Sequence, residues 1–228
     1  MYRSSLLLAS AIFASVACAQ RSRVWLVKGG ANFSRVGDPL GSHHGPRTGR
    51  SADGVGYHIG IGRQFDLPGI WGVRSELLFS SSTTGYYAAS NVFDPRRSST
   101  SQGGVSGTRS MRAQGLELPV LLTLHRWSGL RVEAGPATSI LLKATERWKA
   151  DEAPDGSSET YGLDRTGDLR TLEWAIVLGM EVEGAKGFGA LVRLWKGLSN
   201  LDVAQGASPS YITTWQVGVS YGSRGSSR

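Results

Sequence analysis

The chain has 228 residues, of which 31 are glycine, and a formal net charge of +7. This length suits a single all-β domain, and a charged fraction of 19% is low for a soluble surface. The basic residues are scattered over strands and loops rather than clustered, which argues against a nucleic-acid-binding protein.

The first twenty residues predict a secretory signal peptide. Arg3 precedes an apolar run over residues 4–16, and Ala17-Cys18-Ala19 has the small-x-small pattern of a cleavage site. We therefore expect a signal peptide over residues 1–19 and a mature domain over residues 20–228. The single cysteine would then be lost, which excludes disulfides and thiol chemistry. Lipidation of Cys18 is a weaker alternative, since Ser15 stands where lipoproteins carry an aliphatic residue.

Three segments in the first half of the chain alternate apolar and polar residues, which is the pattern of a β-strand. They cover residues 23–33, 55–65 and 71–80. A polar stretch over residues 34–53 separates the first two, and a short turn over residues 66–69 separates the next two. The Ser/Thr/Gly/Arg-rich segment from residue 81 to about residue 109 is expected to be a long loop.

Residues 116–143 form the clearest hairpin pattern, with two long alternating arms around a turn at residues 125–129. The arms exceed the usual strand length of about 5–6 residues. They match the roughly 9–11 residues that a tilted strand needs to cross a bilayer. Pro119 and Pro136 lie nearly opposite each other and predict a bulge or local break, because proline cannot donate a ladder hydrogen bond.

Three further strands are expected over residues 172–182, 188–195 and 213–221. Before and between them lie a charged segment over residues 144–167, a turn over residues 184–187 and a polar loop over residues 199–210. The connections between the eight expected strands alternate long and short. This alternation predicts an all-β fold, an eight-stranded antiparallel up-and-down transmembrane β-barrel, with short turns and both termini at the periplasmic end.

The glycines indicate which face of the strands points inward. They recur on the polar face, where a solvated surface would gain nothing from them but a narrow eight-stranded interior would gain space. We therefore expect the apolar face to meet lipid and the polar face to line the lumen. Buried charges must be paired, so the favoured interpretation is a salt-bridge network that fills the lumen; a proton or ion path is the alternative. The residues of this predicted network are Lys28, His58, Arg74, Glu76, Glu117, Arg131, Glu133, Glu173, Glu181 and Arg193.

Two finer expectations follow from the turn over residues 66–69. A strand register that pairs residues whose numbers sum to 134 would set His58 opposite Glu76. Trp25, Trp71 and Tyr221 would lie near the periplasmic strand ends, where aromatic residues form interfacial girdles.

No motif predicts catalysis. His43 and His44 fall in the first polar stretch, and neither they nor His58 and His125 have the spacing of a metal site. No serine or aspartate is placed with a histidine in a nucleophile motif. We expect no enzyme activity, no catalytic residues, no metal and no cofactor.

Five segments together resemble the outer-membrane β-barrel (PorT-like) family of Gram-negative bacteria, which is common in the Bacteroidota. The resemblance implies an eight-stranded outer-membrane barrel, in a family mostly without assigned activity. Gln216, Gly218 and Tyr221 resemble the final-strand signal that the barrel-assembly machinery recognises, although seven small or basic residues follow Tyr221. The five segments are VKGGANF (27–33), RSELLFS (74–80), LELPVLL (116–122), EAGP (133–136) and LWKGLSNL (194–201).

The sequence therefore predicts a monomeric protein of the cell outer membrane. Its role would be structural or surface-interacting and carried by long extracellular loops. The expected partners are outer-membrane lipid, the assembly machinery during biogenesis and an unidentified extracellular ligand, but no nucleic acid. Two alternatives stay open: a small-solute channel or secretion-accessory barrel, and an outer-membrane lipid-modifying enzyme.

Overall fold

The computed structural model describes residues 23–37, 51–52, 54–88, 107–127, 129–150, 160–200 and 211–224. The predicted signal peptide over residues 1–19, with Cys18, lies outside the described residues, as do His43 and His44 and much of the predicted long loops. These expectations stay predictions. In the described part of the chain, no helix is long and apolar enough to cross a membrane.

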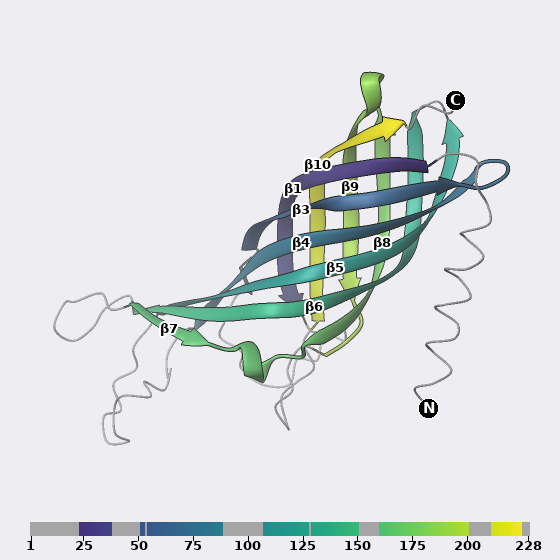
Figure 1. Cartoon of the computed structure of the whole chain (residues 1–228). Helices are drawn as coiled ribbons and strands as arrows, with labels where there is room; N and C mark the ends of the chain where they lie inside the picture. The colour runs from purple at the N-terminus through teal and green to yellow at the C-terminus, as the bar shows by residue number, and fades with distance from the viewer. Residues whose placement is uncertain are drawn as a thin grey trace, which may run out of the picture.

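The strands form one antiparallel sheet that closes on itself (Figure 1). Neighbours in the chain pair with each other, and β1 pairs with β10 to close the sheet. The predicted eight-stranded antiparallel barrel is confirmed, and the two shorter strands add to its rim. The eight long strands are β1 (Arg23–Gly37), β3 (Gly54–Asp66), β4 (Trp71–Ala88), β5 (Gly107–Trp127), β6 (Leu130–Ala150), β8 (Leu172–Glu183), β9 (Phe188–Gly197) and β10 (Tyr211–Arg224). The short strands are β2 (Ser51–Ala52), which pairs with β4, and β7 (Thr160–Asp164), which pairs with β6.

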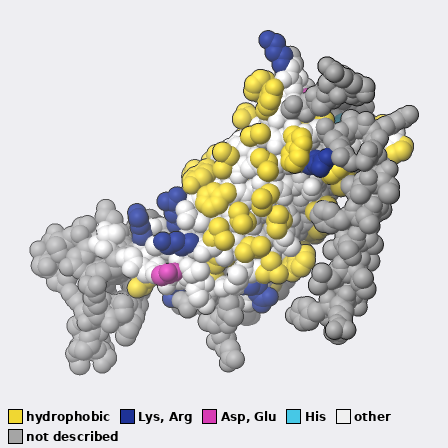
Figure 2. Space-filling view, in the orientation of Figure 1, with side chains coloured by type: hydrophobic (Ala, Val, Ile, Leu, Met, Phe, Trp, Pro, Cys, Tyr) yellow, Lys and Arg dark blue, Asp and Glu magenta, His cyan; other side chains and the backbone are white. Residues whose placement is uncertain are grey.

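Side chains alternate between the two faces of the barrel wall. Outward positions carry large apolar residues that are about half exposed, such as Ile59, Trp174 and Met180, and these side chains cover the barrel surface (Figure 2). Soluble monomers rarely expose contiguous apolar patches of more than a few hundred Å². The outer surface is therefore the lipid-facing one, as expected from the glycine positions.

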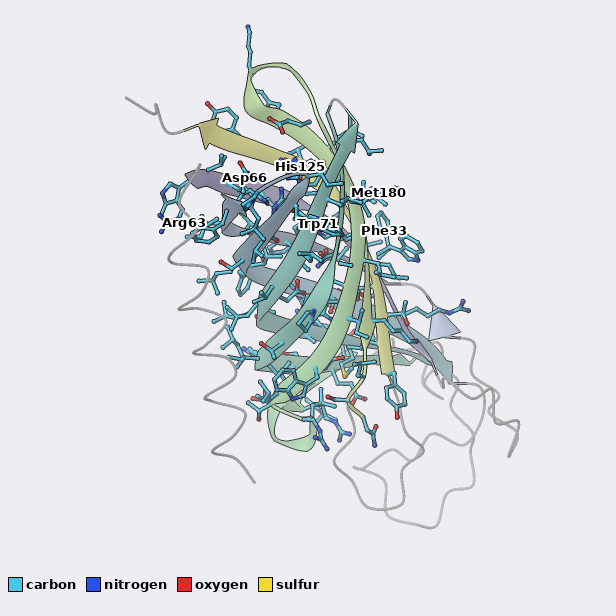
Figure 3. The ribbon with its side chains drawn as sticks, turned by 90° about the vertical axis from the view of Figure 1, so that its right-hand side faces the viewer. Phe33, Arg63, Asp66, Trp71, His125 and Met180 are labelled. Atoms are coloured by element: carbon cyan, nitrogen blue, oxygen red, sulfur yellow. The ribbon has the colours of Figure 1, made fainter. Side chains whose placement is uncertain are left out.

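The short turns lie together at one end of the barrel, near the end of β10 (Figure 1). Asp66, Trp71 and His125 lie at this end (Figure 3). Trp25, Trp71 and Tyr221 are exposed on the outside, as a periplasmic aromatic girdle requires.

The predicted pairing of His58 with Glu76 is wrong. The observed register sets His58 opposite Ser80 and Gly62 opposite Glu76. The β3–β4 turn is centred on Gly69, which has a φ of 84°, and it is closed by a hydrogen bond from the Leu67 N–H to the Trp71 carbonyl at 3.0 Å. The turn is therefore centred two residues later than the sequence suggested. Each side chain keeps its face but changes its opposite neighbour.

The segment expected to be a loop from residue 81 to about residue 109 is strand at its two described ends, residues 81–88 and 107–109. β4 continues to Ala88 and β5 begins at Gly107, while β6 continues to Ala150 and pairs with β7. These strands extend beyond the barrel as a ribbon at the end opposite the short turns (Figure 1). The sequence analysis did not predict this ribbon because strands outside the membrane need no apolar face. Cross-strand hydrogen bonds join backbone groups, so they form between polar residues as well as between apolar ones.

The two prolines interrupt the β5–β6 ladder without shifting its register. Pairing is present at Pro119–Ala137 and again at Leu122–Ala134, but not at the positions between them. The predicted local break is therefore present. Register shifts occur elsewhere in this ladder: between Gln114 and Gly115, where β6 has one extra residue, and between His125 and Trp127, next to the turn.

Candidate functional site

The candidate site is the charged lumen of the barrel. Five charged side chains point inward and are at most 5% exposed: Lys28 on β1, Arg74 and Glu76 on β4, Glu133 on β6 and Arg193 on β9. Five positions on four strands meet because the inward face of each strand turns toward the same narrow axis. The fold thus brings together charges that lie up to 165 residues apart in the chain.

Glu76 is held by two cations. Lys28 Nζ lies 2.6 Å from Glu76 Oε1. Arg193 donates from Nη1 to Glu76 Oε2 at 2.6 Å and from Nη2 to Oε1 at 2.7 Å. This bidentate geometry is the strongest form of an arginine–carboxylate pair.

Arg193 and Arg74 extend the pairing to the other side of the lumen. The Nε of Arg193 also donates to Glu133. Arg74 Nη1 lies 2.9 Å from Glu133 Oε2 and also contacts Glu181. Arg74 Nε donates to Gln64 Oε1 at 2.9 Å. We call this connected set, with Lys28 and Glu76, the lumen network.

The lumen network continues toward the short-turn end. Arg131 lies 3.4 Å from Glu181 and 3.3 Å from Glu183, and its Nε donates to His125 Nε2 at 3.2 Å. Four cationic side chains (Lys28, Arg74, Arg131, Arg193) therefore face four carboxylates (Glu76, Glu133, Glu181, Glu183). Balanced pairing of this kind is what makes buried charge tolerable.

Two glycines leave the space that the lumen network occupies. A Cβ at Gly179 would lie 2.7 Å from Arg193 Cγ and 2.9 Å from Glu133 Oε1, and a Cβ at Gly62 would lie 2.9 Å from Glu76 Cγ. Real Cβ contacts are not that short. The inward glycines of the sequence therefore make room for charged side chains.

An apolar layer adjoins the lumen network. It consists of five inward-facing residues that contact one another and are at most 4% exposed: Leu121, Ala137, Ala175, Val177 and Trp195. They belong to β5, β6, β8 and β9. Such a layer leaves no polar partners for water in this part of the lumen.

Three residues of the predicted network do not join it. His58 Nδ1 hydrogen-bonds to Asn32 Oδ1 at 2.7 Å. Glu117 accepts from Gln216 Nε2 at 2.9 Å. Glu173 forms no ion pair within the described residues and has a buried Oε1 without a hydrogen-bond partner. The other seven predicted residues lie in the lumen network.

Sequence reasoning missed several members of the site. Three polar residues belong to it: Gln64 accepts from Arg74, Thr123 accepts from Gln64, and Ser220 donates to Glu181. Their inward position in the period-two pattern could have identified them. Glu183 was missed because β8 was expected to end at residue 182. Of the predicted assembly residues, Gln216 and Gly218 face inward and Tyr221 faces outward against Phe188, with ring centroids 4.9 Å apart.

The ribbon carries a second group of charges on its outward face. Arg112, Lys143 and Arg147 are exposed, and the β5–β6 register places Arg112 diagonally between the other two. Basic side chains gather over this part of the surface (Figure 2). Nearby on β7, hydrogen bonds from the Thr166 hydroxyl (2.6 Å) and backbone N–H (2.9 Å) lower the pKa of the exposed Asp164 carboxyl.

The described residues contain no group of three or more His, Cys, Asp or Glu that could hold a metal ion.

Residues 18–203 match the sequence family described as "Outer membrane protein beta-barrel domain". The chain belongs to this outer-membrane β-barrel family. The protein is therefore located in the outer membrane. Among curated proteins, none matches the chain significantly.

Solved structures of other outer-membrane barrels follow a similar chain path. Ail, the attachment invasion locus protein of Yersinia pestis, is 13% identical, with a TM-score of 0.45, over 90% of this chain and 100% of that one. Neisserial surface protein A (NspA) is 9% identical, with a TM-score of 0.46, over 86% and 96%. OprG from Pseudomonas aeruginosa is 11% identical, with a TM-score of 0.39, over 91% and 99%. At these identities and TM-scores, no conclusion about this chain is drawn from the similarity.

Proposed function

We propose that this outer-membrane barrel is a closed, non-enzymatic protein with a structural or surface-interaction role. The lumen network is the observation that carries the proposal. Its ion pairs cross the lumen between strands on opposite sides, for example from Glu76 on β4 to Arg193 on β9. Together with the adjoining apolar layer, they leave no continuous polar path for a solute.

The ribbon supports the surface-interaction part of the proposal. It extends β4, β5 and β6 beyond the lipid-facing band at the end opposite the short turns, and it presents Arg112, Lys143 and Arg147 outward. A rigid strand extension holds side chains in place better than a loop does. A partner, if one binds here, would meet a basic, ordered surface; we expect the barrel itself to be monomeric.

A closer affiliation with the PorT-like branch is part of this proposal. It rests on the five resembling segments, and the inward residues among them include Glu76, Glu117 and Glu133. We attach no secretion role to that affiliation.

The closed lumen predicts that the purified barrel carries no steady ionic current in a planar lipid bilayer. Trp195 and Leu121 are at most 4% exposed, and the charges of the lumen network are paired with one another rather than available to a passing ion. The measurement is single-channel recording on protein whose folding is verified by its heat-dependent shift in gel mobility. Steady open-channel events from folded protein would contradict the proposal and favour the channel alternative.

The ribbon is expected to face the cell exterior. Arg112→Cys on β5 should be labelled by a membrane-impermeant maleimide on intact cells, since Arg112 is exposed and a chain cleaved after residue 19 contains no other cysteine.

The matched control is Gly184→Cys in the β8–β9 turn. Gly184 is exposed, and a Cβ there would have its nearest neighbour, the Phe188 carbonyl oxygen, at 3.4 Å. Gly184→Cys should be labelled only after the outer membrane is permeabilised. The reverse pattern would show that the barrel is oriented the other way.

A further inference from the structure

A small cavity lies in the part of the lumen nearer the ribbon, on the far side of the apolar layer from the lumen network. Its volume is about 60 Å³. One water molecule needs roughly 10–15 Å³ by the same measure, so the cavity has space for an ion together with water. The residues that matter here are Glu117, Ser139, Glu173 and Trp195, all of which line it.

Three oxygen-bearing side chains form one row across the wall of this cavity. Glu117 on β5 is directly opposite Ser139 on β6, and Ser139 is directly opposite Glu173 on β8. The two glutamate Cα atoms are therefore two strand spacings apart, or about 9–10 Å. Two glutamate side chains and one bound ion, with ion–oxygen bonds of about 2.3–2.6 Å, fit that span.

The two carboxylates of this row have no cationic partner in the part of the chain that the structure describes. Glu117 and Glu173 are 7% and 8% exposed, and neither makes an ion pair within the described residues. Arg170 also lines the cavity but is exposed at its rim. The cations of the lumen network are matched by its own four carboxylates, so they do not neutralise this pair.

Two buried oxygen atoms at the row accept no hydrogen bond. Glu173 Oε1 is buried and has no hydrogen-bond partner. Gln216 is 1% exposed, and while its amide N–H donates to Glu117, its Oε1 also has no partner. A buried acceptor without a donor is costly, and a bound cation would satisfy acceptors where no N–H or O–H can.

We propose that the row Glu117–Ser139–Glu173 binds one divalent cation of the hard, oxygen-liganded class, with Ca²⁺ as the preferred ion. Two carboxylates balance a divalent charge, and the neutral oxygens of Ser139 and Gln216 add ligands of the type that Ca²⁺ accepts in flexible geometry. The ion would link β5, β6 and β8 above the apolar layer. This site is independent of whether the barrel conducts.

The test uses folded barrel in detergent, stripped of metal with a chelator and titrated with CaCl₂ in a calorimeter. We expect one Ca²⁺ per chain, and Glu173→Gln should weaken binding at least ~10-fold. Asp164→Asn, which removes an exposed carboxylate on β7, is the matched control and should bind as the parent does. Mg²⁺ should bind more weakly than Ca²⁺, and equal or tighter Mg²⁺ binding would contradict the calcium assignment.

Terbium luminescence gives a second readout that locates the ion. Trp195 lines the cavity and is 4% exposed, so Tb³⁺ bound at the row should be excited through its indole. Trp195→Phe should weaken that signal and leave the heat of Ca²⁺ binding unchanged, with any remaining signal coming from Trp174, the residue after Glu173. A Tb³⁺ signal of undiminished strength in Trp195→Phe would place the ion elsewhere and overturn the proposal.

Thermal unfolding separates a binding defect from a folding defect. Without Ca²⁺, Glu173→Gln should be at least as stable as the parent, because it removes an unpaired buried charge; with Ca²⁺, only the parent should gain stability. The proposal is overturned if the parent shows no Ca²⁺ heat up to about 10 mM, beyond the range of weak calcium sites. It is equally overturned if the Glu117→Gln, Glu173→Gln double variant binds as tightly as the parent.

Discussion

Replacing Arg193 with alanine is expected to lower the free energy of unfolding by about 3–5 kcal/mol, the usual cost of removing one partner of a buried ion pair. Arg193 is 1% exposed and holds Glu76 through two hydrogen bonds and Glu133 through a third. Without it, Arg74 is the one ion-pair partner left to Glu133 among the described residues, and Glu76 keeps Lys28 with a longer contact of 3.8 Å to Arg74. Urea unfolding in lipid, followed by tryptophan fluorescence and gel mobility, measures the change.

The control lies on the same strand. Lys196 on β9 is exposed and hydrogen-bonds only to Thr213 within the described contacts, at 2.9 Å, so Lys196→Ala should change stability by less than about 0.5 kcal/mol. Arg193→Lys should recover only part of the loss, since an ammonium cannot form the bidentate pair. If Arg193→Ala were as stable as the parent, the lumen would have to be hydrated rather than tightly paired.

Replacing Gly30 with valine should destabilise the barrel by at least about 1–3 kcal/mol, the usual cost of overpacking. Gly30 faces inward on β1, opposite Gly218 on β10, at the seam where the sheet closes. A Cβ at Gly30 would lie 2.5 Å from the Gly218 Cα and 2.8 Å from His58 Cε1, and closer still to the Val217 carbonyl oxygen. Two of these neighbours are backbone atoms, so the strain cannot be relieved by a rotamer change.

The adjacent residue provides the control. Ala31 lies on the outward face of β1, and Ala31→Val adds two carbon atoms that face the lipid. It should fold as the parent does, whereas Gly30→Val should lower both the urea midpoint and the fraction of chains that reach the folded band on a gel. Equal behaviour of the two variants would mean that β1 and β10 are not closely apposed at this seam.

The architecture was largely predictable because membrane-crossing strands must alternate. Each of the eight long strands contains one predicted segment, and outward Ile59 and Met180 were assigned correctly from period-two alternation together with the glycines on the opposite face. The inward glycines, such as Gly62 and Gly179, were a reliable signal because only glycine leaves space for long charged side chains in so narrow a lumen. The family match agrees with this prediction at the level of the outer-membrane barrel.

Register and pairing were not predictable to the same degree. A difference of two residues in the centre of the β3–β4 turn moved His58 from Glu76 to Ser80 without changing its face, because alternation is insensitive to even shifts. The ribbon was not predicted because its strands do not alternate apolar with polar residues. Residues 81–88 and 107–115 have the composition of a loop but the hydrogen bonds of a hairpin.

The sequence alone determined that the chain is a β-barrel, through its period-two alternation. It also determined which residues face the lipid and which face the lumen, through the glycines on the polar face. Only the tertiary structure decided which inward charges meet. Arg74 reaches Glu133 and Glu181 across the lumen, whereas Glu117 and Glu173, on the far side of the apolar layer, form no ion pair with any residue that the structure describes. Strand tilt and closure set the height at which each side chain enters the lumen, and these are properties of the whole sheet that no single strand encodes.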